Sequence, residues 1–265
     1  TMDIINNNDR QFIEDKLSPI ETKQAILLKE IITQNKILTN QKTDLDEFIT
    51  LMFYRVPSFK SYVEIALKEV VKSTSRFLLR KGKLPLPPPS INRIIEEQGD
   101  DIFDVEILNW KILHDMYTAA SDSDFIQLLE KMSCILIEAP EGCFFITSDS
   151  PVALFDPHYN KKKPYGVGLV DKDIQLSIAI DSKHLILYCW NNIQGIYFAK
   201  PEDVIEYNRR VIIMGQRFIY SPFSEEGLLD LIRKNSEYNA GFDFSTLDYK
   251  DGFTHISRMI PVTIN

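Results

Sequence analysis

Polar side chains that directly follow an apolar run are the clearest candidates for chemistry in this sequence. Phe144-Phe-Ile146 leads straight into Thr147, Ser148 and Asp149, and Pro151 follows. A strand end of this kind presents polar side chains at a cleft, where an aspartate can act as a general base or bind a cation. We therefore take Asp149 and Ser148 as candidate catalytic residues and Thr147 as a candidate ligand-binding residue. The structural alternative is an Asx turn, in which these side chains bind backbone N–H groups as the chain reverses.

Arg55 ends a second predictable element, because it follows the apolar stretch 48–54 and precedes Pro57. An arginine side chain donates two parallel hydrogen bonds to a carboxylate or a phosphate. We expect Arg55 and Asp149 to converge on one pocket between helices and sheet, where Arg55, the third candidate catalytic residue, holds an anionic oxygen. The structural alternative is a buried ion pair that fixes the geometry between the two layers.

The sequence identifies no cofactor and no metal ligands. No dinucleotide fingerprint, phosphate-binding loop or zinc-type Cys/His spacing occurs, so we expect no structural zinc. Asp156 and His158 lie close enough to Asp149 in the sequence to complete a cation-binding set, and this alternative stays open. Ser148 has neither a nucleophile elbow nor an identifiable histidine base, which disfavours acyl-enzyme chemistry.

Net charge argues against general binding of nucleic acid. The 265 residues carry a formal charge of −8, which repels a phosphate backbone. Nucleic acid remains a candidate partner only through the expected helix 59–81, whose polar side is basic. The structural alternative is a solvated helix face, neutralised by the acidic segment 96–141. The basic residues of this helix that recur at multiples of four are Lys60, Lys68, Lys72, Arg76 and Arg80.

Cysteine usage and hydropathy indicate the compartment. Cys134, Cys143 and Cys189 are odd in number and lie in apolar runs, which is typical of thiols in a reducing environment. No segment approaches ~18 uninterrupted apolar residues, and the first residues have no secretory pattern. We expect a cytoplasmic protein that does not interact with membranes.

Hydrophobic periodicity predicts an α+β protein, with a helical N-terminal half packed on a mostly antiparallel sheet in the C-terminal half. The helical part spans residues 12–131 and includes a Pro-rich strap at 84–89. The sheet-rich part spans residues 133–265 and contains two helices. We expect the two parts to form one compact unit.

Local signals predict where three elements begin and end. Ser18, Pro19 and Glu21 together predict a helix that begins at Ser18 with a capping box. The apolar run predicts a strand over 143–147, and the tail from 242 to 265 reads as loops with one strand near 260–264.

Several motifs between Glu14 and Pro222 together resemble a bacterial family known only as a domain of unknown function, DUF4238. The resemblance is most specific at the strand end. The motifs are Ser18-Pro-Ile-Glu21, Arg55-Val-Pro57, Thr147-Ser-Asp149-Ser-Pro151-Val, Asn208 and Ile219-Tyr220-Ser221. The resemblance implies no activity, but it adds Asn208 as a candidate ligand-binding residue. Members of the family usually open with a His-x-x-Pro segment that Thr1–Gln11 does not match; if that histidine belongs to a site with Asp149, this chain carries an incomplete site.

These observations support three functional hypotheses. The first is a hydrolase or transferase that acts on a phosphate-bearing small molecule or on nucleic acid. The alternative is a non-catalytic ligand-sensing or protein-interaction module, in which the same polar residues bind an anionic small molecule or a protein partner. In the third, the polar strand end is purely structural and the basic helix 59–81 carries the function. The sequence does not indicate an oligomeric state.

Overall fold

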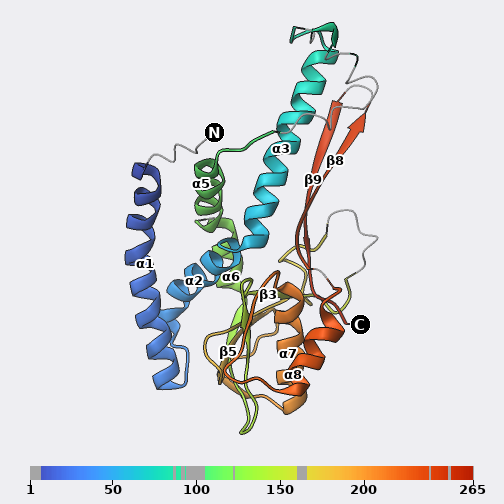
Figure 1. Ribbon diagram of the computed structural model, residues 1–265. Coiled ribbons are helices and arrows are strands. Elements are labelled where there is room, and N and C mark those ends of the chain that lie inside the picture. The colour runs from blue at the N-terminus through green and yellow to red at the C-terminus, as the bar shows by residue number, and fades with distance from the viewer. Residues whose placement is uncertain are drawn as a thin grey trace.

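The protein has helices in its N-terminal half and a mostly antiparallel sheet in its C-terminal half, which confirms the predicted α+β class (Figure 1). The computed structural model describes residues 7–85, 88–90, 93, 105–121, 123–159, 166–238, 240–249 and 252–264. The expected Pro-rich strap at 84–89 therefore lies partly outside the described residues. The helices are α1 (Asn7–Gln34), the 3₁₀ helix η1 (Thr39–Gln41), α2 (Lys42–Tyr54), α3 (Pro57–Arg80), α5 (Asn109–Ala120), α6 (Ser123–Lys131), α7 (Pro201–Met214) and α8 (Glu226–Asn235).

The predicted helix start at Ser18 is wrong, because α1 begins at Asn7 and contains Pro19. The capping-box prediction needs the Glu21 side chain to turn back towards the helix start. In the structure Glu21 instead forms an ion pair with Arg55. A capping signal depends only on neighbouring residues, and here a contact from a distant segment takes over one of its members.

A five-stranded sheet forms the centre of the fold. Its strand order is β3-β4-β5-β1-β6, antiparallel throughout except for the parallel pair of β1 with β6. A separate two-stranded sheet pairs β2 with β7. The predicted strand over 143–147 is wrong in extent, because β2 contains only Thr147 and Ser148. The strands outside the C-terminal tail are β1 (Ser133–Glu138), β2 (Thr147–Ser148), β3 (Ala153–Phe155), β4 (Gln175–Ala179), β5 (His184–Cys189), β6 (Ile196–Phe198) and β7 (Ile219–Tyr220).

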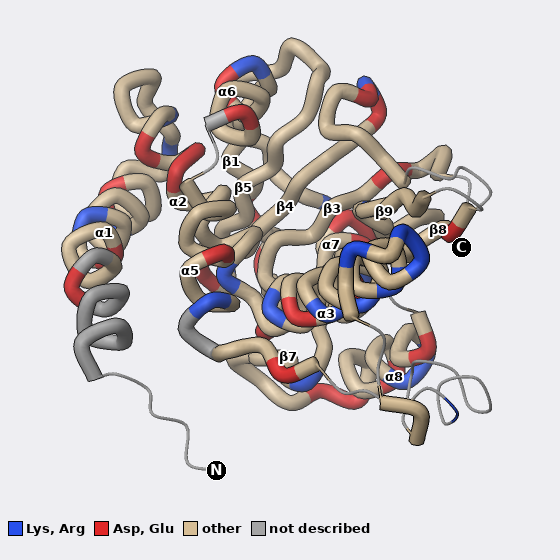
Figure 2. The backbone as a smooth tube through the Cα atoms, turned by 90° about the horizontal axis from the view of Figure 1, so that it is seen from above, with Lys and Arg blue, Asp and Glu red and all other residues tan. Residues whose placement is uncertain are grey.

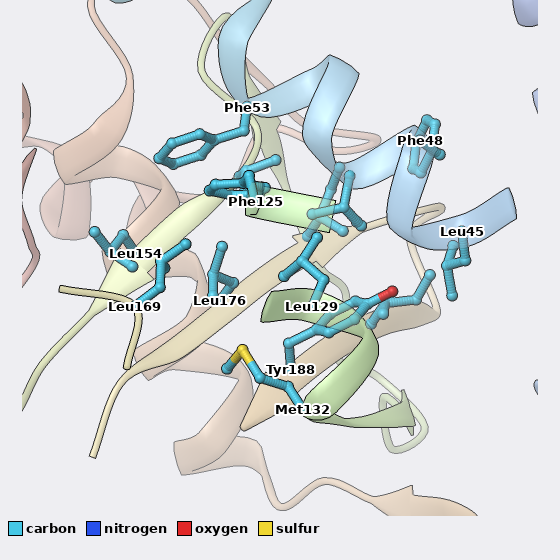
Figure 3. Packing of buried hydrophobic residues seen from close by; sticks show 14 of the residues in the cluster. Leu45, Phe48, Phe53, Phe125, Leu129, Met132, Leu154, Leu169, Leu176 and Tyr188 are labelled. Atoms are coloured by element: carbon cyan, nitrogen blue, oxygen red, sulfur yellow. The ribbon is translucent and has the colours of Figure 1, made fainter. Parts of the chain in front are cut away.

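Helices cover both faces of the central sheet. Alternate side chains of a strand point to opposite faces, so Leu136 of β1 packs with α1, α2 and α6, while Ile135 and Ile137 pack with α7. Figure 3 shows the first of these cores, in which Leu129, Met132 and Tyr188 lie close together. The N-terminal helices thus pack on one face of the sheet, as predicted. Helices α7 and α8 cover the other face.

The tail was predicted as loops with one strand near 260–264, and this prediction is wrong. Two long strands, β8 (Gly241–Tyr249) and β9 (Gly252–Ile260), pair antiparallel and project from the sheet alongside α3 (Figure 1). Phe242 packs edge-to-face on Phe59 of α3, with ring centroids 4.8 Å apart. Residues alternate between the faces of the hairpin, but the helix that covers one face lies far away in the sequence.

The basic side of α3 has carboxylates beside it. Lys68 forms an ion pair with Glu64 of the same helix, and Arg76 lies 3.3 Å from the carboxylate of Asp248 in β8. Figure 2 shows Lys and Arg along α3 next to the hairpin. The acidic segment 96–141, which was expected to neutralise this helix, lies partly outside the described residues. The hairpin supplies a neutralising carboxylate that the sequence analysis did not identify.

Among the described helices, none has the length and apolarity needed to cross a bilayer. The division into parts at residues 131–133 stays a prediction.

A buried polar cluster joins the helical part to the sheet. The Tyr188 hydroxyl of β5 donates to Oδ1 of Asp46 in α2 at 2.7 Å. Lys42 Nζ donates to both carboxylate oxygens, at 3.0 and 3.1 Å, and to Leu129 O at 2.7 Å. Burial raises the pKa of Asp46 above its ordinary value, although the bonds from Tyr188 and Lys42 act in the opposite direction. The cluster therefore costs desolvation energy and fixes one arrangement of α2 on β5.

We predict that Tyr188→Phe lowers the free energy of unfolding by about 1–3 kcal/mol, because it removes one of the two donors to the buried Oδ1 of Asp46 and leaves only Lys42. Denaturant unfolding followed by circular dichroism measures this loss. Tyr249→Phe is the matched control, since Tyr249 is exposed on β8. A loss from Tyr188→Phe no larger than that of the control would show that the hydroxyl does not hold α2 on the sheet.

Candidate functional site

The polar strand end is bound to the loop that follows α7. Asp149 accepts hydrogen bonds from the backbone N–H groups of Gln216 and Arg217, at 2.8 and 3.0 Å. Its own N–H donates to Phe218 O at 3.1 Å. Ser148 Oγ accepts the N–H of Ser150 at 3.1 Å. These are the contacts of the structural alternative, and a catalytic role for Asp149 and Ser148 stays a prediction.

Arg55 and Asp149 have different partners. Arg55 pairs with Glu21 of α1 on a half-exposed surface, and no hydrogen bond or ion pair between described residues joins it to Asp149. The two segments still approach each other, because Ser58 Oγ lies 3.4 Å from Ser150 Oγ. The segments after Arg55 and Asp149 thus approach each other through buried serines, whereas a pocket shared by Arg55 and Asp149 stays a prediction.

The side chain of Asn208 forms the hydrogen bonds to residues 144–146 that a neighbouring strand would otherwise form. Its Nδ2 donates to Phe144 O at 2.9 Å, and its Oδ1 accepts the N–H of Ile146 at 3.0 Å. The residue is buried. This carboxamide therefore holds residues 144–146 in an extended conformation against α7, and both of its functional groups are used for that contact. Ligand binding by Asn208 stays a prediction.

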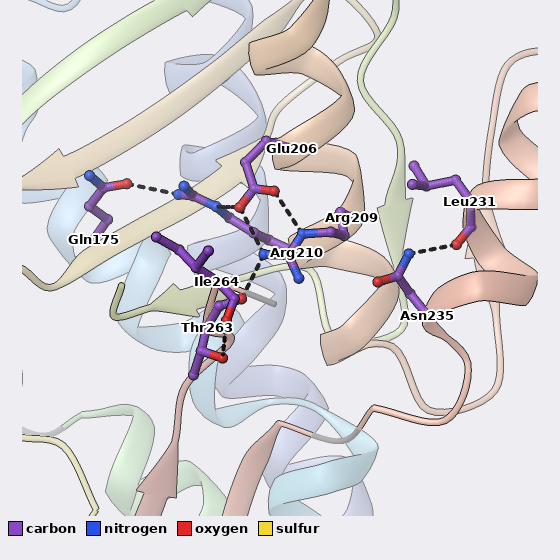
Figure 4. Close-up of polar contacts among 8 residues, drawn as sticks. All are labelled: Gln175, Glu206, Arg209, Arg210, Leu231, Asn235, Thr263 and Ile264. Atoms are coloured by element: carbon purple, nitrogen blue, oxygen red, sulfur yellow. Dashed lines mark hydrogen bonds and ion pairs between the residues drawn. The ribbon is translucent and has the colours of Figure 1, made fainter. Parts of the chain in front are cut away.

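Helix α7 is itself fixed by a network of charged side chains (Figure 4). Glu206 accepts hydrogen bonds from Arg209 and Arg210 at 2.7–2.9 Å. Arg210 also donates to Gln175 of β4, and Arg209 to Thr263 O, each at 2.8 Å. Burial acts to raise the pKa of Glu206, but the hydrogen bonds from the two arginines outweigh it and lower the pKa. The network holds α7 on the sheet and on the C-terminal segment.

A cavity of about 300 Å³ opens between α7 and α8, and we call it the α7–α8 groove. Its lining is mainly apolar and includes the thiol-bearing Cys143. The lining residues are Gly142, Cys143, Phe144, Pro201, Val204, Ile205, Asn208, Glu225, Gly227, Leu228 and Leu231. An apolar pocket at the junction of two layers is typical of a binding site.

Glu225 is the one carboxylate among the described residues that line the α7–α8 groove, and further carboxylates lie at the starts of its two helices. Glu202 and Asp203 lie in the first turn of α7, Glu225 is the N-cap of α8, and Glu226 begins α8. Each helix N-terminus contributes about +0.5 charge. Lys200, the N-cap of α7, and Arg233, which pairs with Glu226, offset part of the charge of these four carboxylates, so the excess of negative charge beside the groove is small.

A second hollow, of about 450 Å³, lies at the other end of the same helix pair, beside Gln216 and Arg217. Arg217 is the only cationic side chain among the described residues that line it. The hollow lies at the C-terminal ends of α7 and α8, and each end contributes about −0.5 charge. The negative charge of the two helix ends offsets the positive charge of Arg217, so an anionic ligand gains little electrostatic binding free energy in this hollow.

The alternative cation site is not assembled. Asp156 Oδ1 accepts the N–H of His158 at 2.8 Å, and the His158 ring lies 3.9 Å from Asp173. The Asp149 carboxylate faces residues 216–217 instead. No group of three His, Cys, Asp or Glu side chains in the described part of the chain has the geometry to hold a metal ion.

Exposed apolar side chains concentrate between residues 193 and 238, a feature that the sequence analysis missed. The available signal was an isoleucine at the solvent-facing position 205 of a charged helix. Large exposed apolar areas usually mark binding surfaces. The residues are Ile193, Ile196, Tyr197, Phe198, Ile205, Phe218, Tyr220, Phe223, Leu229 and Tyr238.

Comparison with known proteins confirms the resemblance inferred from the motifs. The model of the family described as "Protein of unknown function (DUF4238)" matches residues 3–223, and the chain belongs to this family. No curated protein and no solved structure matches. The matched region includes α7 and residues 143–144, whereas α8 and the hairpin follow it. The family model therefore includes the α7 side of the α7–α8 groove but not the α8 side.

We predict that Asn208→Asp destabilises the protein by about 2–3 kcal/mol at pH 7, because an ionised carboxylate cannot donate to Phe144 O and leaves that buried carbonyl unsatisfied. Below the carboxyl pKa of the variant, the protonated side chain regains a donor. The loss relative to the wild type should therefore shrink as the pH falls towards about 4.

Urea unfolding of both proteins at several pH values measures this difference. Asn40→Asp, at an exposed position of η1, serves as the control for adding one charge. A loss from Asn208→Asp that is small at pH 7, or that does not change with pH, would contradict the role assigned to the amide.

Proposed function

We propose that this member of the DUF4238 family is a non-catalytic protein-interaction module, and that the α7–α8 groove binds an apolar, basic segment of another protein. The observation that carries the proposal is an apolar cavity that Glu225 lines, between two helices whose first turns carry Glu202, Asp203 and Glu226. The partner of matching chemistry is an amphipathic helix with leucine-like side chains on one face and lysine or arginine beside them.

The apolar lining supports affinity, and the acidic rim supports selectivity. Burial of one leucine-sized side chain contributes about 1.5–3 kcal/mol. Two such anchors, between Ile205 on α7 and Leu228 on α8, contribute about 3–6 kcal/mol, which offsets part of the ordering costs of binding. Carboxylates at the rim mainly increase the association rate of basic partners and disfavour acidic ones.

The geometry gives less support to a hydrolase or transferase. Both oxygens of Asp149 accept backbone hydrogen bonds, and Ser148 lies without a histidine partner among the described residues. Arg55 is engaged with Glu21. General acid–base chemistry needs a group that can reach the substrate, and these side chains are directed to the protein itself.

Phosphate-bearing partners are also less well supported. The acidic rim repels them from the α7–α8 groove, and the helix ends offset Arg217 in the second hollow. On α3, Arg76 lies beside Asp248, so the basic face is partly neutralised. These charges favour the protein-interaction alternative.

A direct test uses a fluorescein-labelled amphipathic peptide of leucine and lysine as the probe, with binding followed by fluorescence anisotropy. Ile205→Asp should weaken binding at least about tenfold, which corresponds to ~1.4 kcal/mol, because it places a charge in the apolar lining. Ile205 is 56% exposed, so the substitution leaves the core intact. Leu247→Asp, at a 46% exposed position on β8, is the matched control.

Two further measurements define the site and the charge requirement. Bound peptide should slow alkylation of Cys143, which lines the groove, and Cys143→Ser identifies the signal of that thiol. A peptide with glutamate in place of lysine should bind much more weakly. Equal binding of both peptides, or unchanged affinity in Ile205→Asp, would exclude the α7–α8 groove as the site.

A further inference from the structure

The outer edge of the central sheet is formed by β6. This strand is last in the order and pairs only with β1 among the described strands. The N–H of Ala199 donates to Glu138 O at 2.9 Å. Backbone groups of successive residues alternate in direction, so those of Tyr197 point towards β1 and those of Ile196 and Phe198 point outwards. The edge therefore offers two outward N–H and two outward C=O groups.

The side chains of this edge are apolar and exposed on both faces of the sheet. Ile196, Tyr197 and Phe198 are 40%, 47% and 69% exposed. Their register with β1 places Tyr197 on the face covered by α7 and the other two on the opposite face. Natural edge strands are usually protected by charge, proline or a bulge. The segment 191–199 contains no charged residue and no proline.

We propose that β6 pairs with β6 of a second copy of this chain, antiparallel across a two-fold axis at Tyr197. Ile196 then lies opposite Phe198 of the second copy, and the outward groups of these residues form hydrogen bonds in both directions. Tyr197 lies opposite its own counterpart in a non-hydrogen-bonded pair. Aromatic–aromatic and aromatic–β-branched pairs are favourable across strands, so the edge is complementary to itself in both hydrogen bonding and side chains.

Charge and area support a second copy as the occupant. The net charge of −8 makes two copies repel each other over most of their surface. The uncharged segment 191–199 is where they can approach. In two copies, its three strand side chains and Ile193 expose on the order of 1,000 Å² in total, which is the upper limit of the side-chain area that pairing can bury and the lower limit for specific interfaces.

The proposed register makes a disulfide test possible. Residues that face each other in a non-hydrogen-bonded pair have Cα atoms about 4.5 Å apart, which lies within the range of a disulfide. Tyr197→Cys, in a Cys143→Ser background, should therefore form a covalent dimer under mild oxidation. Ile193→Cys is the matched control, because its counterpart lies roughly 20 Å or more away in the paired strands. Circular dichroism verifies that both variants are folded.

Selective cross-linking of Tyr197→Cys supports the proposal; equal cross-linking of both variants, or none of Tyr197→Cys, overturns it. Sedimentation of the uncross-linked protein provides the second measurement. At about 100 μM, a dimer with a Kd of ~10 μM is mostly associated. The wild type should sediment as a dimer and Phe198→Lys as a monomer, whereas a monomeric wild type overturns the proposal.

Discussion

The side-chain amide of Asn208 is the contact on which the geometry of the α7–α8 groove depends. It bonds Phe144 O and the N–H of Ile146, and so places residues 143–146 along α7. Helix α7 is held in turn by the network of Glu206 with two arginines, which reaches β4 and the C-terminal segment. Each of these hydrogen bonds satisfies a polar group inside the protein, and removing its partner lowers the free energy of unfolding. Asn208 and the Glu206 network thus hold the segments that line an apolar surface.

Helix dipoles and side-chain charges distinguish the two ends of the α7–α8 pair. At the N-terminal end, Glu225 lines the apolar cavity, and the carboxylates of the two first turns exceed the nearby cations Lys200 and Arg233 in number. At the C-terminal end, the negative helix ends offset Arg217 in a more polar hollow. The preference for a basic apolar partner follows from this arrangement together with the exposed Ile205 of α7. The uncharged edge at β6 is a separate surface, on the opposite side of the sheet order from β3.

The fold class could be predicted because periodicity and chain order act locally. The switch from helical to strand periodicity near residue 133 is a property of neighbouring residues, and β1 begins there. Contacts between distant segments were not predictable in the same way. Glu21 has the spacing of a capping residue and pairs with Arg55, and the hairpin 241–260 is packed against α3 by aromatic contacts such as that of Phe242 with Phe59. At the site, the motif identified Asp149 and Asn208 as special residues, but their backbone partners at 144–146 and 216–217 depend on the tertiary structure.

Hydrogen–deuterium exchange in the presence of the leucine–lysine peptide tests the central claim most directly. The α7–α8 groove account predicts slower exchange in residues 143–146, 201–208 and 225–231, because a ligand in the cavity covers these segments and reduces their local opening. Exchange in 215–219 and in the hairpin 241–260 should not change. Protection confined to residues 215–219 and 232–238, around the second hollow, or to α3 and the hairpin, would contradict the account and would place the binding surface elsewhere.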